Sequence, residues 1–125
     1  MRKSGILLHI SCLPSPYGIG SLGSDAYKFV DFLSDTHQTY WQILPIGPTS
    51  YGDSPYQTFS AFGGNPYFID LDFLVSEGLL NHDDIINNIH YEINNRYVDF
   101  GELYQSRFKI LRIAYNNFDK NNYDF

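Results

Sequence analysis

A chain of 125 residues with 43% hydrophobic and 18% charged residues is long enough for one domain and too apolar to be disordered. The net charge is -6 and only 8 residues are Lys or Arg, so the sequence offers no basic surface for nucleic acid. A single cysteine, Cys12, excludes an internal disulfide and is typical of a reducing compartment. Since no apolar run approaches the about 18 residues of a membrane span, we expect a cytoplasmic protein without a membrane partner.

The first half of the chain predicts a strand, a helix and a second strand. Residues 5–10 and 40–46 are short apolar runs of the kind found in parallel strands buried on both faces. Residues 24–36 have the periodicity of an amphipathic helix, for which Ser24 is a suitable N-cap. The apolar stripe of this helix contains Ala26, Phe29, Val30 and Leu33. Two such strands joined by a helix form a parallel β-α-β unit.

The two loops that follow these strands leave the same side of the unit, where α/β proteins hold their ligands. The first loop, residues 11–23, contains GIGSLG, which fits a dinucleotide-binding pattern. However, seven residues separate Ile10 from Gly18, and no acidic residue ends the second strand, so the sequence disfavours a dinucleotide site. The four histidines have no metal-ligand spacing, and we expect no metal site.

The second loop, residues 47–66, carries an unusual number of aromatic rings between polar residues. Its rings are Tyr51, Tyr56, Phe59 and Phe62, and its polar side chains include Asp53, Ser54 and Gln57. Aromatic rings present flat apolar faces, and tyrosine adds a polar tip. This combination suits a sugar, which has an apolar C–H face and a rim of hydroxyl groups. For the two phenylalanines, the alternative that their rings only pin the loop stays open.

Asp53 is the carboxylate of this loop, but the sequence offers no partner for it. A retaining glycosyl transfer needs two carboxylates about 5–5.5 Å apart. Asp70 and Asp72 follow the loop in positions typical of the start of a helix. We therefore interpret Asp53 as a turn residue or a hydrogen-bond acceptor for a ligand, and expect no catalytic residue in this chain.

The second half of the chain predicts helices. Residues 69–80 indicate a short helix closed by Gly78, and residues 81–97 one weak helical turn followed by a loop. A last helix begins near Asp99 and ends before a frayed tail, residues 119–125. We expect the apolar stripe of that helix to face the core, with Phe100, Tyr104, Phe108, Leu111, Tyr115 and Phe118.

Two parallel strands that are buried on both faces cannot form a complete sheet, because each leaves an unpaired edge. The pattern therefore indicates the beginning of a larger sheet. Three stretches carry a specific resemblance that agrees with this: SGILLHISCLPSPYGIGSLG, YWQILPIGPTSYGDSPYQTFSAFGGNPYFIDL and LVSEGLL. They resemble the N-terminal part of 4-alpha-glucanotransferases, the amylomaltases or disproportionating enzymes of glycoside hydrolase family 77. Residues 95–118 resemble, more loosely, a helix of that family.

The resemblance implies an α/β fold that starts a (β/α)8 TIM barrel. Residues 1–80 would hold the first two strands, the intervening helix and the long substrate loop 47–66. Residues 81–125 would hold a polar connection and a helix that begins an inserted helical subdomain. The whole chain would then be an incomplete domain.

The resemblance also implies an activity. Enzymes of this family transfer α-1,4-glucan segments to the 4-hydroxyl of another glucan or of glucose, by a retaining double displacement and without a metal or organic cofactor. The substrate-binding positions that match are Tyr51, Asp53, Ser54, Tyr56 and Gln57. The family's catalytic carboxylates belong to later strands, so we expect this chain alone to be inactive without the C-terminal part of the barrel. The sequence departs from the family at Cys12, which is usually Ser or Thr, and at Ser21, where Asp is common.

Two other interpretations stay open at this point. The chain could be a non-catalytic module that binds maltooligosaccharides, or an inactive truncated relic. For the non-catalytic module, as for the enzyme, the resemblance implies α-1,4-glucans and maltooligosaccharides as binding partners.

Overall fold

The computed structural model describes residues 2–118. By its internal contacts the chain forms two compact units. Unit 1 comprises Met1–Ile69 and Ile93–Val98, and unit 2 comprises Asp70–Glu92 and Asp99–Phe125. This differs from a division at residue 80, because the chain leaves unit 1 eleven residues earlier and later returns to it through the segment 93–98.

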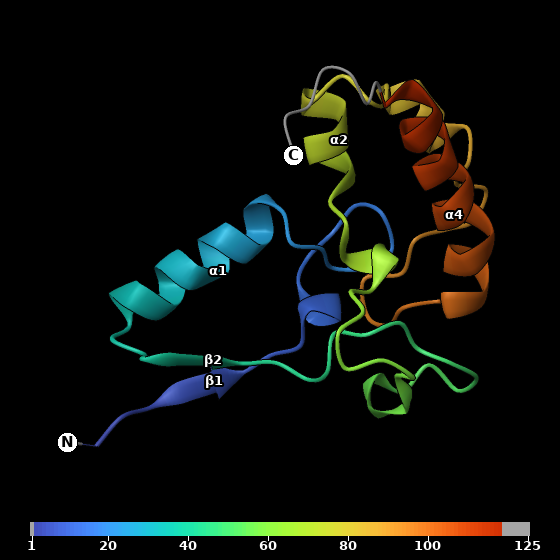
Figure 1. The fold of residues 1–125 in the computed structure, drawn as a ribbon. Helices are drawn as coiled ribbons and strands as arrows, with labels where there is room; N and C mark the ends of the chain where they lie inside the picture. The colour runs from blue at the N-terminus through green and yellow to red at the C-terminus, as the bar shows by residue number, and fades with distance from the viewer. Residues whose placement is uncertain (1, 119–125) are drawn as a thin grey trace. The chain divides into compact units, whose positions relative to one another are not determined.

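Unit 1 is built around two parallel strands, β1 (Gly5–Leu7) and β2 (Tyr40–Gln42), joined through helix α1 (Ser24–Asp35) (Figure 1). The register pairs Gly5 with Tyr40. Trp41 ties the elements together, because its indole Nε1 donates a 2.7 Å hydrogen bond to the Leu8 carbonyl and its ring lies 5.0 Å from that of Phe29 on α1. The predicted parallel α/β unit is confirmed.

The strands are shorter and more exposed than predicted. Each has three residues, and in each the outer two are exposed while the middle one is half-buried. Leu7 and Tyr40 are both 56% exposed. The prediction of strands buried on both faces is therefore wrong for the described residues, because no further strand or second helical layer among them covers the pair.

Helix α1 begins where the sequence predicts, but its details differ. The N-cap is Gly23 and Ser24 is the first helical residue, so Ser24 does not cap the helix as expected. Of the predicted apolar stripe, Ala26 and Leu33 are buried, whereas Val30 is 49% exposed. Only some of the side chains in this stripe are therefore covered by the rest of the described residues.

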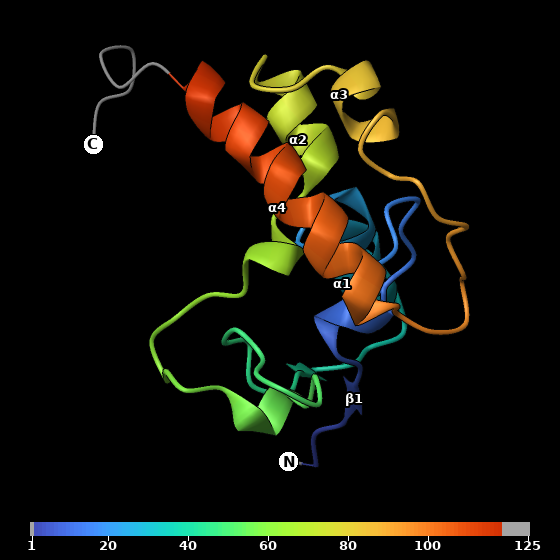
Figure 2. The ribbon, with the colours of Figure 1, turned by 90° about the vertical axis from the view of Figure 1, so that its right-hand side faces the viewer.

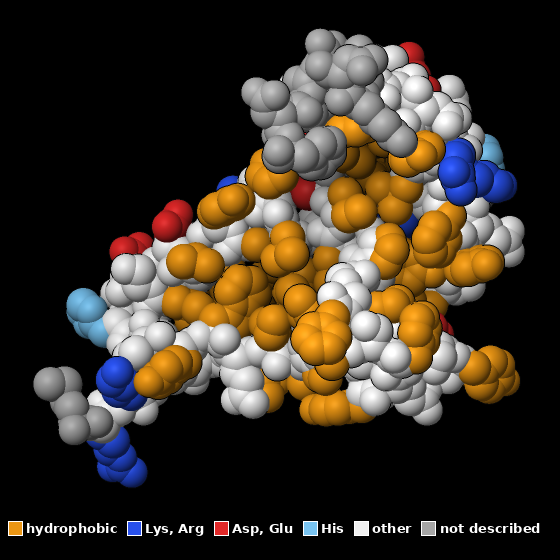
Figure 3. Space-filling view, viewed as in Figure 1, with side chains coloured by type: hydrophobic (Ala, Val, Ile, Leu, Met, Phe, Trp, Pro, Cys, Tyr) orange, Lys and Arg blue, Asp and Glu red, His pale blue; other side chains and the backbone are white. Residues whose placement is uncertain are grey.

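Hydrophobic side chains gather along α1 and β2 on one face of unit 1 (Figure 3). The large exposed apolar residues of these two elements are Tyr27, Val30, Phe32 and Tyr40. An apolar surface such as the one in Figure 3 marks a face that packs against something else.

The first loop of unit 1 folds tightly after a single turn of 3-10 helix, Ile10–Cys12. Its inner residues Ile10, Leu13 and Ile19 are at most 5% exposed. The loop closes on itself at Gly20, whose amide donates to the Ser11 carbonyl at 3.2 Å. A Cβ at position 20 would overlap the Ile10 carbonyl oxygen and lie 2.8 Å from the backbone of Leu13, so only glycine fits there.

Unit 2 contains helices α2 (Leu71–Ser76), α3 (His82–Ile86) and α4 (Phe100–Asn117), with α3 packed against α4 (Figure 2). Asp70 caps α2 by accepting the Phe73 amide at 2.9 Å, and Gly78 follows the helix with φ +74°. Asp99 caps α4 by accepting the Glu102 amide at 3.1 Å. The starts of α2 and α4 and the end of α2 before Gly78 agree with the sequence-based prediction. The short helix α3 agrees with the predicted helical turn before the loop.

The predicted core face of α4 is wrong. The aromatic residues Tyr104, Phe108 and Tyr115 are 65%, 43% and 58% exposed. The buried residues of α4 lie on a neighbouring face: Leu103, Ser106, Arg107, Ile110 and Ala114. Both sets recur with helical spacing, so periodicity alone does not identify the buried one.

The predicted frayed tail, residues 119–125, lies outside the described residues. Within residues 2–118, no helix has both the length and the apolar character needed to cross a membrane.

His9 is the buried titratable group at the end of β1. It is 7% exposed, its ring meets that of Phe68 edge-on at 5.4 Å, and its Nδ1 accepts the Leu44 amide at 3.3 Å. Burial lowers the pKa of His9 below its ordinary value of 6.5. The neutral imidazole, protonated at Nε2, is thus the form that the folded chain holds.

We predict that Gly20→Ala destabilises unit 1 by about 1–3 kcal/mol, the range typical of forced overpacking. Gly64→Ala is the matched control, because nothing lies within 4 Å of a Cβ at that position. The free energy of unfolding is measured by urea titration, following the fluorescence of Trp41, the one tryptophan of the sequence. Equal stability of the two variants would contradict the packing described for the first loop.

We also predict that the stability of the chain falls as the pH decreases below 6.5. The unfolded state then binds a proton at His9 that the folded state resists, so unfolding becomes more favourable until the pH passes the lowered pKa of the folded state. His9→Asn, which keeps an acceptor near the Leu44 amide, should flatten this part of the pH profile of thermal unfolding. His90→Asn, at an exposed histidine, is the control, and an identical flattening by both variants would refute the assignment.

Candidate functional site

The loop 47–66 is the candidate site, and its backbone turns sharply in the middle. Gly52 and Asp53 both have left-handed conformations, with φ of +97° and +56°. The Asp53 amide donates to the Ser50 carbonyl at 3.0 Å, which closes the turn. The absence of a side chain at Gly52 leaves room for the Gln57 amide, whose Oε1 would lie only 3.3 Å from a Cβ there.

A short 3-10 helix, Pro55–Gln57, follows this turn and holds the second half of the site. Ser54 caps it through its hydroxyl, which accepts the Tyr56 amide at 3.4 Å, while its carbonyl accepts the Gln57 amide at 3.0 Å. The Ser50 hydroxyl donates to the Gln57 carbonyl at 3.2 Å and so links the two sides of the loop. Hydroxyl-to-backbone bonds of this kind order a loop without using its aromatic rings.

The end of the loop is ordered in the same way. The Ser60 hydroxyl accepts the amides of Phe62 and Gly63 at 3.2 and 3.0 Å. Asn65 is buried and its side chain accepts the Tyr67 amide at 3.0 Å, which starts the 3-10 helix Pro66–Phe68. The loop is therefore anchored by the buried residues at its C-terminal end.

Of the five predicted site residues, Tyr51 and Asp53 lie in the turn, Ser54 caps the 3-10 helix that follows, and Tyr56 and Gln57 lie within that helix. Tyr51 is fully exposed and Tyr56 is 71% exposed, so both ring faces are open to a ligand. Asp53 and Gln57 are exposed, and Ser54 is half-buried by its role as a cap.

The remaining rings of the loop, Phe59 and Phe62, are 77% and 101% exposed. They do not pin the loop to other described residues, so the interpretation of these rings as anchors is not supported within residues 2–118. Exposing four aromatic rings in one loop is costly in water. This surface suits a ligand or a further protein surface.

The described residues do not include a cluster of acids around the loop. Residues 2–118 hold no group of three or more His, Cys, Asp or Glu side chains placed to bind a metal ion. Asp53 is exposed within a loop whose other polar side chains are neutral. The loop offers aromatic rings for stacking and polar groups for hydrogen bonds.

A second feature of unit 1 was not predicted from the sequence. Residues 94–98, from the polar segment after α3, lie beside the first loop and enclose with it a cavity of about 720 Å³. The sequence contains no local signal for this contact, because residues separated by about 80 positions meet only through the fold. The Asn-rich composition of this segment indicated a loop, but it did not indicate that the loop lies beside residues 11–23.

Comparison with known proteins identifies the family to which these features belong. The family model described as 4-alpha-glucanotransferase matches residues 8–124. The 4-alpha-glucanotransferase of Streptococcus pneumoniae is 55% identical over 117 residues, which are 94% of this chain and 23% of the relative. That of Thermus thermophilus is 46% identical over 117 residues, 94% of this chain and 22% of the relative.

A solved structure agrees with the sequence comparison. The amylomaltase from Streptococcus agalactiae in complex with acarbose has a TM-score of 0.89 and 46% identity, covering 97% of this chain and 25% of that one. The chain thus spans about a quarter of the length of the relatives it matches. On the matched residues, the chain belongs to the 4-alpha-glucanotransferase family, glycoside hydrolase family 77.

Proposed function

We propose that this chain forms the first part of a 4-alpha-glucanotransferase. The complete enzyme transfers α-1,4-glucan segments to the 4-hydroxyl of another glucan or of glucose by a retaining double displacement. The observation that carries this proposal is the 55% identity to a 4-alpha-glucanotransferase across 94% of the chain. The catalytic carboxylates come from the part of the enzyme that follows, and the described residues supply substrate contacts.

In this proposal, Tyr51, Asp53, Ser54, Tyr56 and Gln57 bind the glucan. The open ring face of Tyr56 stacks on the apolar face of a glucosyl unit, near the bond that reacts. Tyr51 stacks farther along the bound chain. The exposed carboxylate of Asp53 and the amide of Gln57 accept and donate hydrogen bonds at the hydroxyl rim. Support comes from the exposure of both tyrosines and from the structural relative, which binds the maltooligosaccharide analogue acarbose.

We infer further that β1 and β2 are the first two strands of a (β/α)8 barrel, and that unit 2 begins an inserted helical subdomain. Among the described residues the outer edges of both strands are unpaired, which supports this, as does the apolar surface along α1 and β2. A closing barrel would pair the edges and cover that surface. The C-terminal part of the barrel is then the required partner of this chain.

The proposal is tested in a full-length hybrid enzyme. Residues of this chain replace the 117 matched residues of the Streptococcus pneumoniae relative, and disproportionation of maltotriose is followed by the glucose released. We expect the hybrid to be active and the 125-residue chain alone to form no glucose, because this proposal places the catalytic carboxylate pair in the part of the enzyme that the chain does not cover. An inactive but folded hybrid, or glucose release by the isolated chain, would refute the proposal.

Substitutions in the hybrid test the role of the loop. Tyr56→Ala should lower kcat/KM for maltotriose by about tenfold to a hundredfold, since it removes the stacking surface of a large ring. Tyr51→Ala should act mainly on longer maltodextrins by raising KM. Tyr115→Ala removes a 58% exposed tyrosine on α4, outside both the loop and the apolar surface along α1 and β2, and serves as the control. If Tyr56→Ala and Tyr115→Ala have equal effects, the loop does not bind substrate.

A further inference from the structure

His9 is a buried polar residue to which the proposed function gives no role. It lies just after β1, which ends at Leu7, and it is only 7% exposed. Burying a polar side chain is unfavourable unless hydrogen bonds replace those lost to water. Two specific contacts of the His9 ring lie at opposite ends of loop 47–66, and they indicate what this residue does.

The first contact is at the beginning of the loop. The Nδ1 atom of His9 accepts a hydrogen bond from the Leu44 amide at 3.3 Å. Leu44 lies between the end of β2 at Gln42 and the start of the loop. The chain is therefore held by His9 at the point where it leaves the strand and enters the loop.

The second contact is at the end of the loop. The ring of His9 meets that of Phe68 edge-on, with centroids 5.4 Å apart and planes at 81°. Phe68 is 4% exposed and is the last residue of the 3-10 helix Pro66–Phe68, into which the loop runs. Its amide donates to the Asn65 carbonyl at 3.0 Å, and its carbonyl accepts the Leu22 amide at 2.9 Å. His9 thus packs against a residue that backbone hydrogen bonds already hold in place.

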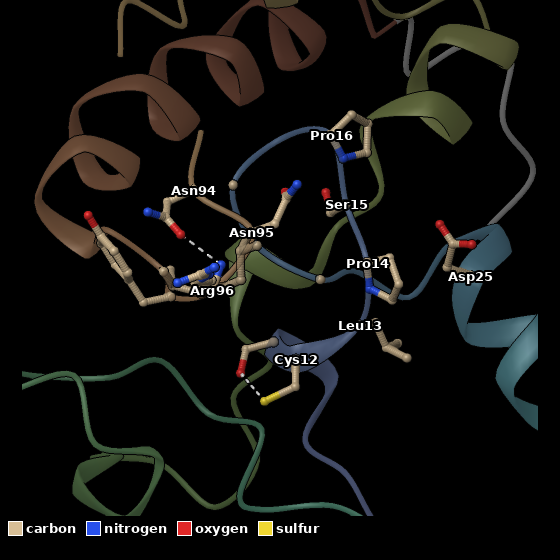
Figure 4. Close-up of a pocket in the computed structure, with 15 residues that line it drawn as sticks. Cys12, Leu13, Pro14, Ser15, Pro16, Asp25, Asn94, Asn95 and Arg96 are labelled. Carbon is tan, nitrogen blue, oxygen red and sulfur yellow. Dashed lines mark hydrogen bonds between the residues drawn. The ribbon is translucent and has the colours of Figure 1, made fainter. Parts of the chain in front are cut away.

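The backbone of His9 adds a third connection, to the first loop. Its carbonyl accepts the Cys12 amide at 2.9 Å and so starts the 3-10 helix Ile10–Cys12. Residues 12–16 then run along the cavity of unit 1 (Figure 4). One residue therefore joins the start of the first loop to both ends of the second.

The ends of loop 47–66 are important because its middle is exposed. Tyr51 is fully exposed and Tyr56 is 71% exposed. The hydroxyl groups of Ser50, Ser54 and Ser60 bond to the backbone of the loop itself. Such bonds give the loop its own shape but do not fix its position relative to the strands. Among the described residues, that position depends on the two ends that His9 contacts.

We propose that His9 is a positioning residue for glucan transfer, which holds the two ends of loop 47–66 so that Tyr56 and its neighbours meet the substrate. The glucan as the ligand of the loop rests on the proposed function, whereas the contacts between His9 and the ends of the loop do not. Histidine suits this position because it combines an acceptor for the Leu44 amide with a flat ring for Phe68. Asparagine would supply only the acceptor, and phenylalanine only the ring.

The first test measures maltotriose disproportionation by variants of the full-length hybrid. His9→Ala removes both contacts and should lower kcat/KM at least about tenfold, because small displacements of substrate-positioning groups slow a reaction strongly. His9→Asn and His9→Phe each keep one contact, so their kcat/KM values should lie between those of His9→Ala and the unchanged hybrid. These two variants carry the test by themselves if His9→Ala does not fold.

Leu33→Ala is the matched control for a loss of stability. Leu33 is a core residue of α1, is 5% exposed and lies outside the loop. Its truncation should lower the melting temperature of the hybrid and leave kcat/KM unchanged, at a temperature at which every variant is folded. Equal losses of kcat/KM in Leu33→Ala and in the His9 variants would overturn the proposal.

A double variant distinguishes positioning from an independent effect. If His9 acts by holding Tyr56 in place, then Tyr56→Ala has already removed part of what His9 contributes. His9→Ala combined with Tyr56→Ala should therefore lose less activity than the product of the two single losses. A loss equal to that product would contradict the positioning role.

Hydrogen exchange measures the hold on the loop without any activity. In the hybrid, peptides that cover residues 43–69 should exchange at least about fivefold faster in His9→Ala, because the ends of the loop open more often. Peptides from α1 should be unaffected by His9→Ala and should exchange faster in Leu33→Ala. Unchanged exchange of residues 43–69 in His9→Ala would refute the hold on the loop.

The two kinds of measurement separate this inference from the proposed function. An inactive hybrid whose residues 43–69 exchange faster in His9→Ala would refute the proposed function and support the hold of His9 on the loop. An active hybrid that Tyr56→Ala impairs, but that the three His9 variants leave unchanged, would refute the positioning role and support the proposed function.

Discussion

The parallel pairing of β1 with β2 is the constraint on which the positions of both loops depend. Because the strands run in the same direction, with Gly5 opposite Tyr40, the loops that follow them leave the same end of the pair. A hydrogen bond from Trp41 to the Leu8 carbonyl fixes the point at which the first strand turns into its loop. An antiparallel pairing would carry the two loops to opposite ends and separate the cavity from the aromatic turn.

Local chemistry explains which parts of the fold were predictable from the sequence. The cap at Asp70 and the stop at Gly78 depend on one side chain or one backbone conformation each, and both agree with the structure. The burial of Val30 and of the aromatic residues of α4 was wrongly predicted. Burial depends on what packs against a face, and a helix with apolar residues on two faces does not show by its spacing which one is covered.

The candidate site was likewise predictable from the sequence only in part. Its composition, with rings and polar groups in one irregular segment, is sufficient to single out loop 47–66 from the sequence. The conformation that presents those rings was not predictable, because it depends on hydroxyl-to-backbone bonds from Ser50, Ser54 and Ser60. The cavity wall formed by residues 94–98 was also missed, because the sequence of neither segment predicts a contact between segments that are far apart in the chain.

The left-handed backbone at Asp53 limits how evolution and experiment can change this position. Aspartate, asparagine and glycine adopt that conformation readily, whereas for alanine it costs about 1–2 kcal/mol. An alanine substitution there would alter the path of the chain together with the charge, and an effect on glucan binding would have two causes. Asparagine removes the charge and keeps the turn. At position 53 one residue determines both the backbone conformation of the loop and the charge it presents. Only an isosteric substitution separates these two effects.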